Sequence, residues 1–484
     1  MRARILEEPE LEFGNGGRHV DPRTGISDYG PVDDASPGAP RTIRVGIVGP
    51  ADGVTGVRQW LERCREPIDA KEGNRHPSLF RDFPGCSPNS AFRAELVVDD
   101  SWTRPIAARS LKQAVAQPIG LATAECVDLY HQEIADLSER GVVDVVIVAR
   151  PDDLEDDIPA RSRSNTDELE ESTTLDAKHV DFHDLLKARS TAHRPPIQIV
   201  RSTTWDPQRD TAKKRSRRRP SLQDEATRAW NIHTALYYKA GGVPWRLQRR
   251  ASQLDSLFVG VSFFHTNDRT RMHTSVAQVF DERGEGVVVR GGPAARHKDD
   301  RQPHLDRDGA AQLLGDALDT YRREHHNFPA RVVVHKTSAF DDTETSGFED
   351  AADQRFINHL ELIWISDGGE GVRLFRDGDH PVLRGTLATI ARDRHLLYTR
   401  GSVEYYRVYP GMYVPSPIGL RPALAESDIE TLATEVLALS KMNWNQSQLD
   451  GRLPITLKAS RRVASILKHM PTGAGASSRY AHFM

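Results

Sequence analysis

Lys239 lies in a segment whose residue types could hold an anion. Residues 230–247 read WNIHTALYYKAGGVPWRL, and the apolar side chains up to Tyr238 recur at helical spacing, which predicts an amphipathic helix. The pair Gly241-Gly242 predicts the end of this helix, because glycine readily adopts the positive φ of a helix C-terminus. Lys239 is therefore expected in the last turn, beside a tight corner, where its ammonium group can point at an anionic ligand. The same position also suits a lysine that only pairs with the helix dipole.

His183 and Lys187 form a second candidate pair. They lie four residues apart in FHDLLKARS, a spacing that places both on one face of a helix. Together they could contact an anionic ligand. The pair is also typical of an ordinary solvated helix face, and its spacing alone does not separate the two interpretations.

A run of positive charge, KKRSRRR, occupies residues 213–219. This density favours binding to a phosphate backbone, because each contact releases condensed counterions. Charge runs are also common in solvated loops, so both interpretations stay open. The candidate backbone-binding residues of this run are Lys213, Lys214, Arg215, Arg217, Arg218 and Arg219.

Composition limits the class of protein. The 484 residues carry a formal net charge of −4, so a phosphate-binding surface must be a local concentration of Lys and Arg. The length predicts two or three globular domains. The three cysteines show no CxxC spacing, so neither a disulfide framework nor a zinc site is indicated, and a reducing cytoplasm is the expected location. No apolar run approaches the roughly 18 residues of a membrane span, so no membrane contact is expected.

The first half of the chain alternates strands with helices. Three apolar runs predict buried parallel strands, and they span residues 42–49, 141–149 and 197–201. Helical patterns follow or separate them at residues 54–64, 122–140 and 182–190. This alternation predicts a doubly wound α/β domain. Residues 1–41, rich in Gly, Pro and Asp, are expected to form an extended arm, and residues 151–178 an acidic loop.

After the glycine pair the pattern changes. Antiparallel strands joined by short loops are expected at residues 256–264, 275–280 and 286–290. A long helix at residues 310–325 and a further strand at residues 330–335 follow. This succession predicts the opening of an RNase H-like fold. Two closing helices are expected near residues 429–438 and 460–469.

Several segments resemble the Argonaute family, and in particular its short prokaryotic members. They are LEFGNGG and DYGP in the arm, RVGIVGP, LFRDFPG at residues 79–85, HKTSAF, NWN followed by LPITLK, and the KAGG segment around Lys239. The resemblance implies an α/β chain without N and PAZ domains. After the arm at 1–41 it places a Rossmann-like MID domain at 42–225 and an RNase H-like PIWI domain at 226–484.

The resemblance also implies a pocket for the 5′ phosphate of a guide strand. Its residues would be His183, Lys187, Gln198 and Lys239, which follow the order and spacing of the family's pocket. A terminal phosphate offers nearly two charges and three acceptor oxygens, which ammonium and amide donors can share. His183 could stack on the first base, where many relatives have tyrosine. Arg201 is a weaker backbone-binding candidate, and Met484 could help to hold a non-catalytic Mg²⁺ through its carboxylate.

Guided nucleases of this family hold two Mg²⁺ ions with clustered carboxylates. At the matching positions this chain has Ser262 and Thr337, whose hydroxyls cannot replace bridging carboxylates. The resemblance therefore implies a chain that does not cleave. An active nuclease is the alternative if Asp255, Asp268 or Asp341 takes the catalytic place instead. A third reading, an α/β metabolic enzyme, would need a nucleotide motif such as GxGxxG, which the sequence lacks.

Short prokaryotic Argonautes divide the work between two chains. By resemblance, this chain would bind a small 5′-phosphorylated guide RNA and recognise complementary single-stranded DNA. A partner protein with an APAZ region would form a heterodimer with it and carry the effector, a TIR or sirtuin-like NADase or a nuclease. Target recognition, followed by oligomerisation, would then activate the effector in defence against plasmids or phages.

Overall fold

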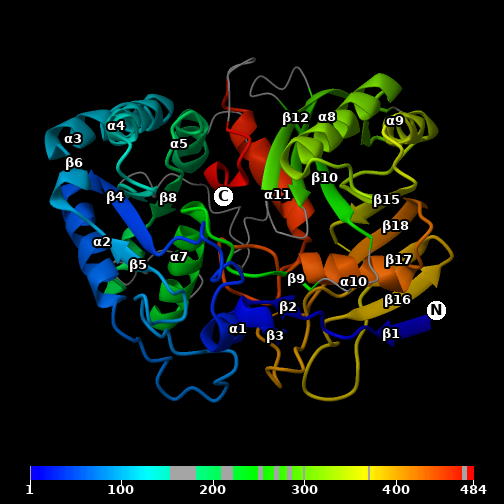
Figure 1. Cartoon of the computed structure of the whole chain (residues 1–484), viewed down its shortest axis with the longest axis horizontal. Coiled ribbons are helices and arrows are strands. Elements are labelled where there is room, and N and C mark those ends of the chain that lie inside the picture. The colour runs from blue at the N-terminus through cyan, green and yellow to red at the C-terminus, as the bar shows by residue number, and fades with distance from the viewer. Residues whose placement is uncertain are drawn as a thin grey trace.

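Two β-sheets organise the chain (Figure 1). The computed structural model describes residues 2–152, 181–208, 222–248, 254–265, 272–280, 286–297, 300–368, 371–411, 413–470 and 477–484. Within these residues, one of these sheets has five strands and the other has ten, and a third, small sheet joins β3 (Arg18–His19), β2 (Leu11–Glu12) and β9 (Arg246–Leu247). None of the helices described is long and apolar enough to cross a membrane.

The five-stranded sheet is built from the apolar runs of the first half of the chain. Its strands are β4 (Thr42–Pro50), β5 (Glu95–Val97), β6 (Thr103–Ile106), β7 (Val145–Ala149) and β8 (Ile197–Val200). All of its pairings are parallel, and β7 lies between β4 and β8. Since β7 is buried throughout, it matches the apolar pattern of parallel strands that are covered on both faces. The predicted buried strands are confirmed.

Helices cover both faces of this sheet. On one face, α2 (Ala51–Arg63) packs its apolar side chains against β4 and β7, and α7 (Glu225–Lys239) contacts β8. The other face is covered by three helices, which are α3 (Ala108–Val115), α4 (Ile119–Arg140) and α5 (Phe182–Ser190). The helices predicted in the first half are therefore present, and α5 has the bounds expected from its sequence.

The ten-stranded sheet is of mixed direction. In spatial order its strands are β1 (Arg2–Ile5), β16 (Thr386–Ala391), β17 (Arg394–Leu397), β18 (Ile418–Leu424), β15 (His359–Ser366), β14 (Arg331–Lys336), β10 (Ser256–His265), β11 (Met272–Phe280), β12 (Gly286–Arg296) and β13 (Pro303–His304). The strands β10, β14 and β15 pair in parallel, whereas β10, β11 and β12 form the predicted antiparallel succession.

Alternate residues of the central strands face two different cores. Val259 and Val334 pack with α8 (Arg307–His325) and α9 (Asp342–Asp353). Phe258 and Val333 face the opposite side, in the core that contains α10 (Ile429–Leu439) and α11 (Ile455–Leu467). Of these helices, α9 was not expected from the sequence, because its polar sequence DTETSGFEDAAD has little apolar periodicity.

Helix α11 joins the two sheets. It packs on β10 and β11 and also contacts α5 of the other half. Figure 1 shows α11 in the centre of the molecule, with the C-terminus beside it. One continuous core extends from β4 through α7 to α11, so side chains from distant parts of the sequence meet at this junction.

The N-terminal arm is not wholly extended, contrary to the expectation for residues 1–41. It contains the helix α1 (Pro22–Tyr29), which Asp21 caps by accepting a hydrogen bond from the Thr24 amide. Proline at the first helical position and Gly30 (φ 79°) after the last one fix its ends. The Gly, Pro and Asp content that indicated an irregular arm therefore includes the start and stop signals of a helix.

Candidate phosphate-binding site

The elements that carry the four predicted pocket residues meet where α5, β8 and α7 approach the C-terminus. His183 and Lys187 lie on α5, which Asp181 caps at its N-terminus. Gln198 lies on β8, and Lys239 is the last residue of α7. After Lys239 the chain turns at Gly241, whose φ of 98° permits the predicted glycine end of the helix.

Lys187, Gln198 and Lys239 come together around the main-chain oxygen of Met484. The Lys187 Nζ donates hydrogen bonds to this oxygen and to the Ile197 carbonyl, at 3.1 Å in the second case. The Lys239 Nζ donates to the same Met484 oxygen at 3.1 Å and to the Gln198 Oε1. Three of the four residues expected in the pocket are therefore in one place.

The two ammonium groups are deeply buried and close to each other. Lys187 is 1% exposed and Lys239 is 2% exposed. Burial lowers the pKa of Lys239 to about 7, and the nearby Arg462 adds to the effect. Burial also lowers the pKa of Lys187 well below its usual range, with further repulsion from Lys239 and Arg462. An entering dianion would relieve this repulsion, because it places negative charge beside both ammonium groups.

His183 lies beside this group but contacts Arg462, a residue of α11. One Arg462 nitrogen (Nη1) donates to the Asp184 Oδ1 at 2.9 Å, and the other (Nη2) lies 2.9 Å from the His183 Nε2. Burial and the adjacent guanidinium lower the pKa of His183 to about 3. The imidazole is therefore neutral and accepts from the arginine, because a guanidinium can only donate. Since His183 keeps 30% of its side chain exposed, it lies at the border of the pocket.

Sequence reasoning missed Arg462 and His482. Arg462 lies 279 residues from the histidine that it contacts, and it is one of two adjacent arginines in a helix, with no local sign of a partner. His482 belongs to the short helical turn Tyr480–His482. Burial lowers the pKa of His482 to about 4, with repulsion from Arg479 and from both pocket lysines. The only feature of the sequence that could have indicated His482 as a pocket residue is its position two residues before Met484.

The remaining backbone-binding candidates are less well defined. Arg201 follows β8, has an exposed side chain and precedes a short 3₁₀ turn, where its carbonyl accepts from the Thr204 amide at 2.9 Å. Its role stays a prediction. The basic run at residues 213–219, from Lys213 to Arg219, lies outside the described residues.

Ser262 and Thr337 occupy neighbouring places in the ten-stranded sheet. Val261 of β10 is opposite Lys336 of β14 in the parallel register, and the Thr337 amide donates to the Val261 carbonyl at 3.2 Å. Ser262, inside β10, therefore lies beside the carboxyl end of β14, which Thr337 directly follows. Ser262 is buried.

Two of the three alternative acidic residues, Asp255 and Asp341, belong to the described part of the chain. Asp255 precedes β10, and its carbonyl accepts from the first amide of β14 at 3.0 Å, so it lies at the opposite end of the strands from Ser262. Asp341 caps α9 by accepting from the Glu344 amide at 2.8 Å. Asp268 lies outside the described residues.

The chain is similar to Argonautes in sequence and in fold. No protein-family model matches the chain. An Argonaute from Aquifex aeolicus is 22% identical over 239 residues, which are 49% of this chain and 31% of that protein. An Argonaute from Cereibacter sphaeroides is 22% identical over 271 residues, 51% of this chain and 34% of that protein. The matched part is thus about half of this chain and a third of these curated relatives.

Solved structures share the fold over the full chain. Clostridium butyricum Argonaute, solved with a guide DNA and a 19-mer target DNA, superposes with a TM-score of 0.61 at 12% identity, over 99% of this chain and 54% of that one. Drosophila Piwi gives 0.59 at 13% identity, over 100% and 56%. Aa-Ago with externally bound siRNA gives 0.60 at 14% identity, over 99% and 56%. The chain therefore has the mixed α/β fold of Argonaute and Piwi proteins and spans about half their length.

Proposed function

We propose that this chain binds a guide strand by its 5′ phosphate and uses it to recognise a complementary strand. The observation that carries the proposal is the pair of buried lysines, Lys187 and Lys239, which share one main-chain oxygen. Two buried ammonium groups side by side repel each other, and a dianion that joins them would offset the cost. A terminal phosphate, with nearly two charges at neutral pH, is an anion of suitable charge.

Gln198 and His183 complete the proposed pocket in different ways. The Gln198 amide now accepts from Lys239, and its NH₂ group can donate to a phosphate oxygen. The neutral His183 ring is partly exposed at the border, a suitable position for stacking on the first base of the guide. Arg462 would hold that ring in place through its contact with it and with Asp184.

The expected Mg²⁺ fits this pocket only together with a phosphate. The oxygens that could bind it, those of Met484 and Gln198, each accept a hydrogen bond from a lysine. A cation alone would enter a region that is already positive. In this proposal the two lysines, and not the ion, bind the guide phosphate first.

We further propose that the chain senses its target without cutting it. Ser262 and Thr337 supply hydroxyls where the family resemblance would require carboxylates. In this proposal residues 42–225 act as a MID domain and residues 226–484 as a PIWI domain. The effector activity, an NADase or a nuclease, belongs to an APAZ-containing partner in a prokaryotic defence complex. The guide would be RNA and the target single-stranded DNA.

One experiment tests both parts. The purified chain, co-expressed with its neighbouring gene product if needed, is loaded with RNA guides that carry either a 5′ phosphate or a 5′ hydroxyl. Labelled complementary DNA is then added with Mg²⁺ or Mn²⁺, and retention and cleavage are followed together. Intact target retained only with the phosphorylated guide supports the proposal. Cleavage at one fixed position contradicts the non-cleaving role, and retention that does not depend on a guide contradicts guided recognition altogether.

A further inference from the structure

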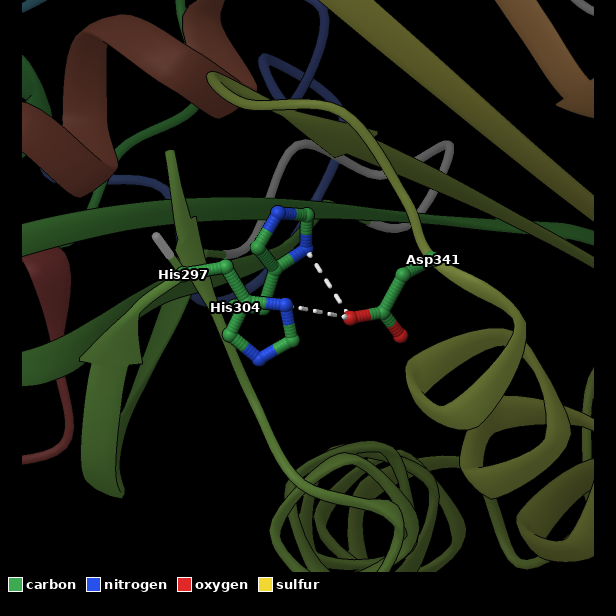
Figure 2. Close-up of side chains that lie close together, drawn as sticks. All are labelled: His297, His304 and Asp341. Atoms are coloured by element: carbon green, nitrogen blue, oxygen red, sulfur yellow. Dashed lines mark ion pairs between the residues drawn. The ribbon is translucent and has the colours of Figure 1, made fainter. Parts of the chain in front are cut away.

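Three potential metal ligands lie together at the edge of the ten-stranded sheet (Figure 2). His297 directly follows β12, His304 belongs to the edge strand β13, and Asp341 precedes α9. One ligand atom from each lies within 4.8 Å of the other two. Figure 2 shows both imidazole rings directed at the Asp341 carboxylate, with the Nδ1 of each 3.5 Å from the Asp341 Oδ2.

His304 is held in the tautomer that a metal ligand needs. Its side chain is 1% exposed, and its Nε2 lies 2.8 Å from the Asp300 Oδ2. Because a carboxylate can only accept, the proton of the neutral ring is on Nε2 and the Nδ1 carries a lone pair. A carboxylate behind the distal nitrogen is the usual support of a metal-binding histidine.

The Nδ1 lone pair of His304 lacks a hydrogen-bond donor among the described residues. It faces the Asp341 Oδ2 and the Glu344 Oε2, each at 3.5 Å. Three electron-rich atoms directed at one another in a buried place repel one another, and an unpaired buried polar atom is costly. A cation between these atoms would remove the repulsion and give the Nδ1 lone pair a partner.

The spacing favours a metal ion over a proton. A proton shared between a ring nitrogen and a carboxylate draws the heavy atoms to roughly 2.7–3.2 Å, whereas these pairs are 3.5 Å apart. Around a tetrahedral Zn²⁺ with bonds of about 2.0 Å, neighbouring ligand atoms are about 3.3 Å apart. The distances from the two imidazole nitrogens to the Asp341 carboxylate are therefore close to those around such an ion.

Local charge also suits a divalent ion. The ammonium of Lys336 is buried and pairs with Glu344, so it balances one carboxylate. The carboxylates of Asp300 and Asp341 remain as two negative charges beside the two imidazoles. One divalent cation would balance them.

We propose that His297, His304 and Asp341 bind a divalent transition ion of the Zn²⁺ class. Two imidazole nitrogens and one carboxylate oxygen are ligands that Zn²⁺ accepts, with a fourth position left for water or Glu344. The ion joins the end of β12 and the edge strand β13 to the start of α9. Its role is structural, since it fixes a sheet edge that otherwise depends on a two-residue strand. This inference does not rest on guide binding.

The test uses untagged full-length chain that has been freed of metal with a chelator. Zn²⁺ is added, excess ion is removed, and bound metal is measured by elemental analysis, with affinity from competition against a chromogenic chelator. We expect one tightly held ion per chain and a higher melting temperature with Zn²⁺, because a ligand that binds only the native state stabilises it. Co²⁺ in the same site should give visible absorption bands of a nitrogen- and oxygen-ligated ion.

Three variants identify the ligands. Asp341→Asn removes the charge but keeps the cap of α9, since asparagine caps as well as aspartate, and His297→Ala changes a half-exposed residue. Both should weaken Zn²⁺ binding at least 100-fold, and Asp300→Asn about tenfold, as expected for a supporting residue. His380→Ala, at an exposed histidine elsewhere, is the control and should bind as the parent chain does. If the parent chain holds no more Zn²⁺ than His297→Ala and Asp341→Asn, the site does not exist.

Discussion

The lysine pocket and the histidine–aspartate cluster both contain buried polar groups whose charge is not balanced, positive in the pocket and negative in the cluster. In the pocket, two buried ammonium groups repel each other and share one oxygen, that of Met484. In the cluster, a buried nitrogen lone pair meets two carboxylate oxygens without a donor in the described part of the chain. The difference teaches that the sign of an unbalanced buried group indicates the sign of its ligand, since a fold tolerates such a group at a cost.

The largest expected effect is a difference in stability between two variants, each of which loses one buried lysine. Lys336→Met leaves the Glu344 carboxylate buried without its partner, which should lower the free energy of unfolding by about 3 kcal/mol. Lys187→Met removes an ammonium that is repelled by Lys239, and the Met484 oxygen keeps its hydrogen bond from Lys239, so the change should stay within about 1 kcal/mol. Urea unfolding without guide measures both. Equal losses would mean that Lys187 also balances a native charge.

Guide selectivity should follow the pocket lysines. The variant with Lys187→Ala and Lys239→Ala loses two charge-assisted contacts to the phosphate, each of about 1.5–3 kcal/mol. Affinity for 5′-phosphorylated RNA should therefore fall roughly 100-fold or more, while affinity for 5′-hydroxyl RNA changes little. Filter binding with both guides measures the ratio. Lys112→Ala, at an exposed lysine of α3, is the matched control, and equal losses for both guides would remove the phosphate assignment.

Arg462→Leu should disturb the border of the pocket. The substitution removes the guanidinium that contacts Asp184 and His183. We expect a stability loss of about 2 kcal/mol, since a nearly buried carboxylate loses its partner. The pKa of His183 should rise from about 3, because the neighbouring positive charge is gone. NMR titration of the ring measures the pKa, and an unchanged value would show that burial alone sets it.

The smallest effect is a pH dependence of phosphate binding. Burial lowers the pKa of Lys239 to about 7, so the free pocket loses this positive charge as the pH rises through 7. A bound dianion favours the ammonium form, so binding takes up a proton there and affinity falls, by at most tenfold per pH unit. The ratio of 5′-phosphate to 5′-hydroxyl affinity between pH 7 and 8.5 checks the sign. A ratio that rises over this range would contradict a Lys239 that is charged in the complex.

Short-range sequence patterns predicted the lysine pocket better than the histidine–aspartate cluster. The helix that carries His183 and Lys187, the strand of Gln198 and the glycine end after Lys239 all depend on short-range patterns, which the sequence displays directly. Arg462 could not be predicted, since its contact with His183 requires the packing of α11 against α5. The metal ligands were missed because the sequence argument counted cysteines, while His304 and Asp341 come from different elements. Helix α1 was missed because its caps resembled loop residues.

The first strand of the chain has a consequence for how the molecule is made. Residues of β1 pair with β16, with Arg2 opposite Thr389, so β1 finds its partner strand only after the further 387 residues up to Thr389 have been synthesised. At about 5–20 residues per second, β1 waits on the order of 20 to 80 seconds on the ribosome. Until β16 is made, β1 has no partner strand in the sheet, and an unpaired strand is the kind that pairs with foreign chains. Closure of the large sheet is thus a late event in biogenesis.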